Sequence, residues 1–238
     1  MSSIDLGSEL LNYIVEQGFQ PGDRLPSINE LQDESNLGIS ISKVREQLEV
    51  ARALGLVEVR SKTGTRLKVY DFAPAVRLSL MFALATDLSN FELFSQLRNH
   101  LEVAFWHEAC ASLQEEDKAF MRSCIQAARA KLNDRWIRIP NQEHRDFHLT
   151  VFKRLENPFV IGLLEAYWDA YNAAGLNQYA EYDYLQEVWD YHERILDAIC
   201  ASNIDAARDL FIEHTRLLNH QPRVQKMQDK RALTEVDE

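Results

Sequence analysis

Residues 21–67 carry the pattern that most restricts the fold of this chain, because they predict a helix, a short turn, a second helix and a tight hairpin in succession. Ser27, followed three residues later by Glu30, forms a capping box, in which each side chain accepts a hydrogen bond from a backbone N–H at the start of a helix. This helix is expected to run to about Ser35. It should stop at Asn-Leu-Gly, residues 36–38, since Asn and Gly tolerate the backbone angles of a short turn.

The second part of this stretch predicts another helix and a hairpin. Either Ser40 or Ser42 can cap a helix whose apolar residues recur at helical spacing and which ends at Gly55. Residues 56–60 and 65–69 then alternate between apolar and polar side chains, as strands do, with Ser-Lys-Thr-Gly as the turn between them. Two helices joined by a short turn and followed by a hairpin form the plan of a winged helix-turn-helix.

The distribution of charge decides whether such a domain can bind DNA. The formal net charge of −11 argues at first against a nucleic-acid partner. Residues 36–68, however, contain seven basic and three acidic side chains, so this segment is locally positive and most of the negative charge lies beyond residue 70. A basic module on an acidic body can still bind phosphates, while repulsion by the body would suppress non-specific binding. An amphipathic helix is expected at about residues 6–17. Together with the winged helix-turn-helix it would form a DNA-binding domain over residues 1–70.

Beyond a short linker at residues 71–74, the sequence predicts helices only. Short breaks separate them, so we expect a mainly α protein in which an antiparallel bundle of six to seven helices, residues 75–222, follows the winged domain. A polar tail at residues 223–238 completes the chain. The predicted helices span about 75–86, 89–112, 116–132, 141–156, 158–174, 179–201 and 203–219.

The composition also limits the cellular setting. No run of about eighteen apolar residues is present, so no membrane partner is expected. The amino end lacks the basic and apolar segments of a signal peptide. Cys110, Cys124 and Cys200 are an odd number without CxxC spacing, and we interpret them as reduced core thiols of a cytoplasmic protein.

Four histidines lie on apolar faces of three predicted helices. His144 and His148 are four residues apart and point the same way, while His192 and His214 belong to two later helices. A buried imidazole needs a polar partner, so histidines that converge from three helices could satisfy one another around a divalent cation. A single histidine on an apolar face is more often an ordinary core residue, and this alternative stands beside the metal hypothesis.

At this point several motifs resemble a known family. Residues 21–67, with PGDRLPS, EL and then ISISKVREQLEVARALGLVEVR and GTRL, resemble the DNA-binding domain of the GntR family of bacterial transcriptional regulators. The helical remainder is similar to its FadR subfamily, which has an FCD-type effector domain. The motifs there are FH at 147–148, NP at 157–158, YHERILDAI at 191–199 and A…IEH at 206–214. The resemblance implies a homodimeric regulator, with repression as the expected mode, that binds a palindromic operator.

The resemblance implies a set of DNA contacts. Ser40 and Arg45 would bind phosphates at the start of the recognition helix, and the wing would reach toward the minor groove. Ile41 and Asn29 stand where the family often has Arg, which removes guanine-reading side chains and predicts a different operator or more dependence on Lys43 and Asn29. Alternatively, the basic residues are solvated surface charge. The candidate DNA-binding residues are Asn29, Ser40, Ser42, Lys43, Arg45, Lys62, Thr63, Gly64 and Arg66.

The resemblance also implies a metal site, since FCD domains often hold a metal with an Asp-x-x-x-His pair and a His on each of two later helices. His148, His192 and His214 occupy the three histidine positions, and His144 stands at the Asp position. Four neutral nitrogen ligands favour zinc or nickel over manganese, with one divalent ion per chain, and leave a positive site that suits an anionic effector. If His144 points away, a three-histidine site remains.

Arg98 is the candidate effector-binding residue. With Leu101 and Glu102 it resembles the R-x-x-L-E signature of the family, and its guanidinium could hold the carboxylate of a small effector in a bidentate manner. The alternative is an ion pair between Arg98 and Glu102 within one helix. Two other functions stay open: a constitutive dimeric DNA-binding protein without metal, and a metal-dependent enzyme. The sequence argues against an enzyme, because no Asp or Glu has a recognisable general-base spacing to the histidines.

Overall fold

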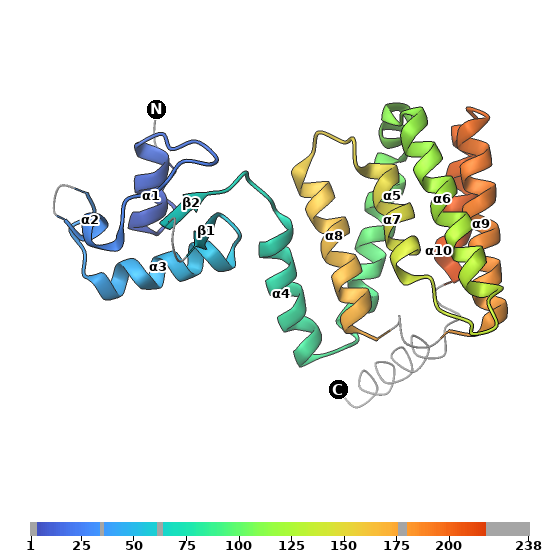
Figure 1. The fold of residues 1–238 in the computed structure, drawn as a ribbon, viewed down its shortest axis with the longest axis horizontal. Helices are drawn as coiled ribbons and strands as arrows, with labels where there is room; N and C mark the ends of the chain where they lie inside the picture. Colours follow the sequence, from blue (N-terminus) through green and yellow to red (C-terminus); the bar gives the residue numbers. More distant parts are fainter. Residues whose placement is uncertain (1–3, 34–35, 61–63, 176–179, 218–238) are drawn as a thin grey trace, which may run out of the picture. The chain divides into compact units, whose positions relative to one another are not determined.

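The computed structural model describes residues 4–33, 36–60, 64–175 and 180–217, and the chain forms two compact units, residues 1–78 and 79–238 (Figure 1). The expected fold class is confirmed: a small two-stranded sheet follows three helices in the first unit, and the second unit is helical in its described part. The predicted polar tail at 223–238 lies outside the described residues.

The first unit has the order of a winged helix-turn-helix. The capping box of Ser27 and Glu30 is present, with the Ser27 backbone N–H 2.7 Å from a Glu30 carboxylate oxygen. Ser40, and not Ser42, caps the second helix of the motif, and its hydroxyl accepts a hydrogen bond from the Lys43 N–H. The elements are α1 (Glu9–Glu16), α2 (Ile28–Gln32), α3 (Ile41–Ala53), β1 (Val57–Arg60) and β2 (Gly64–Leu67).

These elements enclose a small apolar core. Leu10 of α1, Leu31 of α2 and Val44 of α3 are fully or almost fully buried in it, and Val57 of β1 closes it from the sheet. Gln47 also ties α3 to α1, because its side-chain oxygen accepts hydrogen bonds from the Leu10 N–H and the Ser8 hydroxyl. The antiparallel strands place Val57 opposite Leu67.

Gly55 ends α3 as predicted and also fixes the next contact. It has a φ of +76°, which favours glycine. A Cβ at this position would lie 2.5 Å from Pro74 Cγ, so the backbone and this proline can approach closely only because residue 55 has no side chain.

The expected linker at residues 71–74 is shorter than predicted. Ala73 and Pro74 are the first residues of α4 (Ala73–Thr86), because the Asp71 carboxylate accepts a hydrogen bond from the Ala73 N–H at 2.9 Å and starts the helix early. The boundary between the two compact units falls inside this helix, between Leu78 and Ser79.

The second unit is an antiparallel bundle, as predicted (Figure 1). Helix α9 packs on α10 and α6, α6 packs on α7, and α5 contacts α7, α8 and α10. Among the helices of the described residues, none combines the length and apolar character that crossing a membrane requires. The bundle helices are α5 (Asn90–Ser112), α6 (Glu115–Leu132), α7 (Asn141–Phe152), α8 (Pro158–Ala173), α9 (Tyr182–Cys200) and α10 (Ile204–Leu217).

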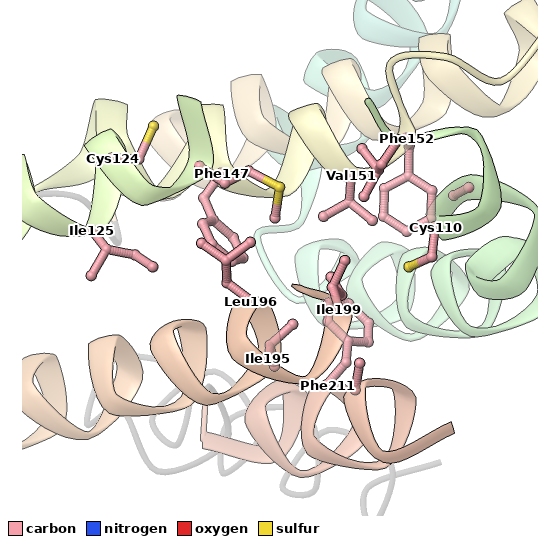
Figure 2. Close-up of a cluster of buried hydrophobic side chains, with 14 of the residues drawn as sticks. Cys110, Cys124, Ile125, Phe147, Val151, Phe152, Ile195, Leu196, Ile199 and Phe211 are labelled. Carbon is pink, nitrogen blue, oxygen red and sulfur yellow. The ribbon is translucent and has the colours of Figure 1, made fainter. Parts of the chain in front are cut away.

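The centre of the bundle is apolar (Figure 2). Phe147 and Val151 of α7 face Ile195 and Leu196 of α9, and all four side chains are almost completely buried. The bundle core provides the rigid walls on which the polar residues described below are held.

The cysteines follow the sequence interpretation only in part. Cys110 and Cys124 are buried free thiols, and burial raises the pKa of Cys110 to about 12 and that of Cys124 to about 11. Cys200 is a free thiol too, but it is exposed at the end of α9, so the expectation that it lies in the core is wrong. It is the last residue of α9 and lies off the buried face that Leu196 and Ile199 form in the same turn.

Candidate functional site

Three helices of the bundle bring the four predicted histidines together. Helix α7 supplies His144 and His148 one turn apart, α9 supplies His192, and α10 supplies His214. One ring nitrogen of each lies within 4.8 Å of those of the other three. His148, His192 and His214 are buried and His144 is half-buried. The histidines are therefore core residues that also form one cluster.

Two of the nitrogen-to-nitrogen distances are close to those of a tetrahedral metal site. His148 Nε2 lies 3.2 Å from His214 Nε2 and 3.1 Å from His192 Nε2. Four nitrogens at a zinc–nitrogen distance of about 2.0–2.1 Å would be about 3.3 Å from one another. One buried candidate ligand atom, His144 Nε2, has no hydrogen-bond partner within the described part of the chain. Because buried polar atoms are rarely left unpaired, this cluster fits a cation.

A backbone carbonyl orients one of the candidate ligands. His192 Nδ1 lies 2.7 Å from the Val188 carbonyl oxygen, which can only accept. Nδ1 therefore carries the proton and the Nε2 lone pair points into the cluster, as it does in many histidines that bind metals.

The electrostatic setting keeps all four imidazoles neutral. Burial is the largest cause that lowers the pKa of His144, His148 and His214 well below 6.5, and it lowers the pKa of His192 to about 3. The positive charge of Arg98 acts in the same direction. Neutral imidazole is the form that binds metal, so the cluster is ready to coordinate at neutral pH.

Arg98 of α5 joins the histidine cluster and also forms the ion pair that the sequence left as an alternative. Its Nε lies 2.5 Å from Glu102 Oε2, and both side chains are buried. Its Nη2 lies 2.9 Å from His148 Nδ1. A buried, forked cation next to neutral imidazoles is suited to an anionic ligand.

Glu102 is a site residue that the sequence reasoning missed. Its Oε1 lies 3.7 Å from His148 Nδ1, so an acidic residue lies beside the histidines although none has a recognisable general-base spacing to them in the sequence. Burial raises the pKa of Glu102 to about 7, and Arg98 opposes that rise. The available signal was its spacing from Arg98, but only the fold reveals the proximity to a histidine of another helix.

Aromatic rings wall the cluster. The Arg98 guanidinium carbon lies 4.5 Å from the centre of the Tyr167 ring, and the His144 and Trp168 ring centres are 4.8 Å apart. A cavity of about 20 Å³ lies between them, with Tyr171 also in its lining. This volume suffices for about one water molecule. His100 and His107 lie apart from the cluster, along an open groove between α5 and α10.

The candidate DNA-binding residues occupy the first unit. Ser42, Lys43 and Arg45 are exposed in the first turns of α3, and Asn29 is exposed on α2. Ser40 caps α3. This arrangement is compatible with phosphate contacts at the amino end of α3.

The residues predicted to contact DNA from the wing differ in their structural setting. Lys62 and Thr63 lie outside the described residues, and Gly64 begins β2 with a φ of +80°. Arg66 is half-buried. Its Nη1 donates a hydrogen bond to the Gly22 carbonyl at 2.7 Å, which ties β2 to the loop before α2. Arg24 was not predicted as a site residue. It is exposed and passes beside Gly64, and its place in the PGDRLPS motif was the available signal.

Comparison with known families covers most of the chain. Residues 93–217 match the family model described as FCD domain. Residues 5–67 match the model described as bacterial regulatory proteins, gntR family. The two matches correspond to the histidine-containing bundle and to the winged helix-turn-helix.

Two transcriptional regulators and one solved structure are similar to this chain over most of its length. The Uxu operon transcriptional regulator of Escherichia coli (strain K12) is 26% identical over 216 residues, which cover 88% of this chain and 82% of that protein. The HTH-type transcriptional regulator LutR of Bacillus subtilis (strain 168) is 25% identical over 82% of this chain and 89% of its own length. The solved structure of Streptococcus agalactiae GntR superimposes with a TM-score of 0.63 at 20% identity, covering 88% of this chain and 94% of that chain, and so supports the fold.

Proposed function

Because the chain belongs to the GntR family of bacterial regulatory proteins and has an FCD effector domain, we propose that its bundle binds one divalent metal ion and a small carboxylate, and that this ligand weakens operator binding. The family identifies the chain as a transcriptional regulator and not an enzyme, as the sequence predicted. The metal, the effector and the repressor mode are the proposed parts.

One observation carries the metal proposal: the histidine cluster with its short nitrogen-to-nitrogen distances. His148 Nε2 lies 3.1 Å from His192 Nε2 and 3.2 Å from His214 Nε2, and the remaining candidate ligand, His144, belongs to the same group. His144, His148, His192 and His214 would hold the ion. An all-nitrogen set favours zinc or nickel. The ion would supply a positive charge to which a carboxylate can coordinate.

Arg98 supports a carboxylate as the effector. Its guanidinium is buried beside His148 and over Tyr167, so an anion near the histidines would meet a forked donor in a setting of low dielectric constant. The present cavity of about 20 Å³ holds less than a carboxylate ligand, so binding requires side chains to move apart.

The DNA-binding proposal rests on α3. Ser40, Ser42, Lys43 and Arg45 would contact phosphates and base edges, and Asn29 of α2 would add to the readout. Lys62, Thr63, Gly64 and Arg66 would form the wing contact. We further propose a homodimer on a palindromic operator, since the symmetry of two identical chains is matched by two half-sites. The cytoplasm, where bacterial DNA lies, is the proposed location.

The effector can change operator affinity only if it binds the DNA-competent and DNA-incompetent states with different affinities. A ligand at the histidine cluster would meet this condition if it bound a form of the bundle in which α5 is shifted from α7 and α10, which it contacts here, and if that form were less competent for DNA. We propose that ligand binding weakens operator binding, so that the ligand reduces operator occupancy.

The test uses an operator fragment selected from random-sequence DNA by the purified protein. Fluorescence anisotropy would measure its affinity with zinc, with a chelator, and with zinc plus each member of a panel of small carboxylates. We expect at least one acid to weaken binding in the presence of zinc. His148→Gln should abolish this response and retain basal DNA affinity. Affinity that is indifferent to metal, chelator and acids would instead identify a constitutive DNA-binding protein.

A further inference from the structure

We infer that Arg98 and a metal ion compete for His148, so that metal binding releases the Arg98 guanidinium for an anionic ligand. This inference rests on the proposed metal site and adds its regulation: an arginine donates a hydrogen bond to the ring nitrogen of one ligand that faces away from the cluster.

The donor and acceptor inventory fixes the histidine tautomers that this geometry requires. Arginine nitrogens can only donate, and Arg98 Nη2 lies 2.9 Å from His148 Nδ1, so this ring nitrogen must be an acceptor. The neutral His148 ring then has its proton on Nε2. That N–H faces His192 Nε2 at 3.1 Å, which is an acceptor because His192 Nδ1 donates to the Val188 carbonyl. The bonds from Arg98 to Val188 are thus mutually consistent, and His214 Nε2, which lies 3.2 Å from the same His148 Nε2–H, must be a second acceptor.

Coordination requires the opposite tautomer of His148. A lone pair on Nε2 is needed for a ligand that faces the other three histidines, so the proton must move to Nδ1. An Nδ1–H cannot accept from Arg98, and the two donors would repel each other. The hydrogen bond between Arg98 and His148 and the coordination of His148 through Nε2 therefore exclude each other.

Glu102 is positioned to take over the role of Arg98. Its Oε1 lies 3.7 Å from His148 Nδ1 and needs only a small shift to accept the new N–H. A histidine that donates to a carboxylate while its other nitrogen coordinates metal is a recurrent arrangement that orients the ring. Glu102 would then hold His148 in the metal-bound form, as Arg98 holds it in the metal-free form.

The released guanidinium would face the small cavity. Arg98 stays close to Glu102 Oε2, at 2.5 Å through Nε, and over the Tyr167 ring, while its Nη2 loses its acceptor. Buried donors without an acceptor are costly, so an anion that enters beside the histidines is favoured only after metal has bound. The metal would thus increase anion affinity in two ways, through its own charge and through Arg98.

Nitrogen NMR of histidine tautomers tests the inference directly. The full-length protein, labelled with ¹⁵N-histidine, contains seven histidines, and the resonances of His148 are assigned by their loss in His148→Gln. The spectrum is recorded without metal and then with one equivalent of Zn²⁺. We expect His148 to carry its proton on Nε2 without metal and on Nδ1 with zinc, and His192 to carry it on Nδ1 in both states.

Arg98→Met and a matched control, Arg122→Met, separate this role from a general structural one. Without Arg98 the donor to His148 Nδ1 is gone, so the form with its proton on Nε2 loses that partner and we expect a larger share of Nδ1–H in metal-free protein. Zinc affinity, measured by competition with a chromophoric chelator, should rise roughly tenfold. Arg122 pairs with Asp197 on the outside of the bundle, and its replacement should change neither result.

The outcomes distinguish the inference from the proposed function. If the protein binds zinc but His148 already has its proton on Nδ1 without metal, the inference of competition between Arg98 and metal is wrong. The proposed metal site would remain. A protein that binds no zinc, with His148 protonated on Nε2, would overturn both. If Arg98→Met does not fold, the wild-type spectra alone decide.

Discussion

Lowering the pH from 7.0 to 5.5 should destabilise the metal-free bundle, because four buried imidazoles must stay neutral in the folded state. Burial holds the pKa of His144, His148 and His214 well below 6.5 and that of His192 at about 3. The unfolded chain binds protons at these sites as the pH falls below 6.5, whereas the folded chain does not. Stability is therefore present above pH 6.5 and is lost as the pH falls.

The size of the effect follows from proton linkage. Each histidine that stays neutral in the folded state lowers the free energy of unfolding by about 1.3 kcal/mol between pH 7.0 and 5.5. Four such histidines therefore lower it by about 5 kcal/mol. Glu102 acts in the opposite direction: its pKa is raised from 4.5 to about 7, so the folded state gains a proton in this window and is stabilised by about 1.6 kcal/mol. The histidine contribution is larger than that of Glu102. We therefore expect the free energy of unfolding to fall by about 3–4 kcal/mol, a large part of the stability of an ordinary domain.

Urea unfolding followed by tryptophan fluorescence measures this loss in the bundle alone, since all four tryptophans lie beyond residue 78. The samples contain a chelator at both pH values. His144→Phe should reduce the loss by about 1.3 kcal/mol, whereas the exposed His100→Gln should leave it unchanged. A free energy of unfolding that is equal at pH 7.0 and 5.5 would refute the buried, neutral cluster.

Three further predictions concern single residues. Gly55→Ala should destabilise the first unit by roughly 1–3 kcal/mol, through both the positive φ and the clash with the neighbouring proline; Gly7→Ala has a positive φ but open space, so an equal drop in thermal stability for the two variants would contradict the clash. Arg45→Ala should weaken all DNA binding and reduce the salt slope by about one, whereas Arg122→Ala should not; an unchanged slope between two salt concentrations would show that α3 is not the recognition helix. Asp117→Asn should cost about 1–3 kcal/mol at pH 7, because the buried carboxylate is paired with two cationic side chains that hold its pKa well below 3.8; this cost should shrink as the pH falls below 3.8, and a cost independent of pH in urea unfolding would be inconsistent with the ion pairs.

Local chemistry made much of the fold predictable. The capping box at Ser27 and Glu30 and the stop at Gly55 depend on neighbouring residues only, and both are present. Where two local solutions were equally good the sequence could not decide: Ser40 and Ser42 both fit a helix start, and the structure uses Ser40. The end of α2 at Gln32 and the early start of α4 are similar cases, since single side-chain or turn interactions move a boundary by a few residues.

The histidines of the site could be predicted from the sequence, either from their spacing on one helix or from their position in a motif. His144 and His148 share a face by their spacing alone, and the two later histidines were matched by motif. Contacts between distant segments were not predictable. Arg98 and His148 are fifty residues apart, and their hydrogen bond depends on how α5 packs on α7, which no local pattern encodes. The bond of Arg66 to the Gly22 carbonyl is of the same kind.

Metal content is the most direct test of the central proposal, that the histidine cluster is a metal site. The measurement is elemental analysis of full-length protein purified without chelator or metal-affinity resin, for wild type, His192→Ala and the exposed control His100→Ala. We predict about one zinc or nickel ion per chain in wild type and the control, and its loss in His192→Ala. Wild-type protein that contains no metal, even after incubation with both ions, would contradict the account and leave the histidines as core residues of a regulator that responds by other means.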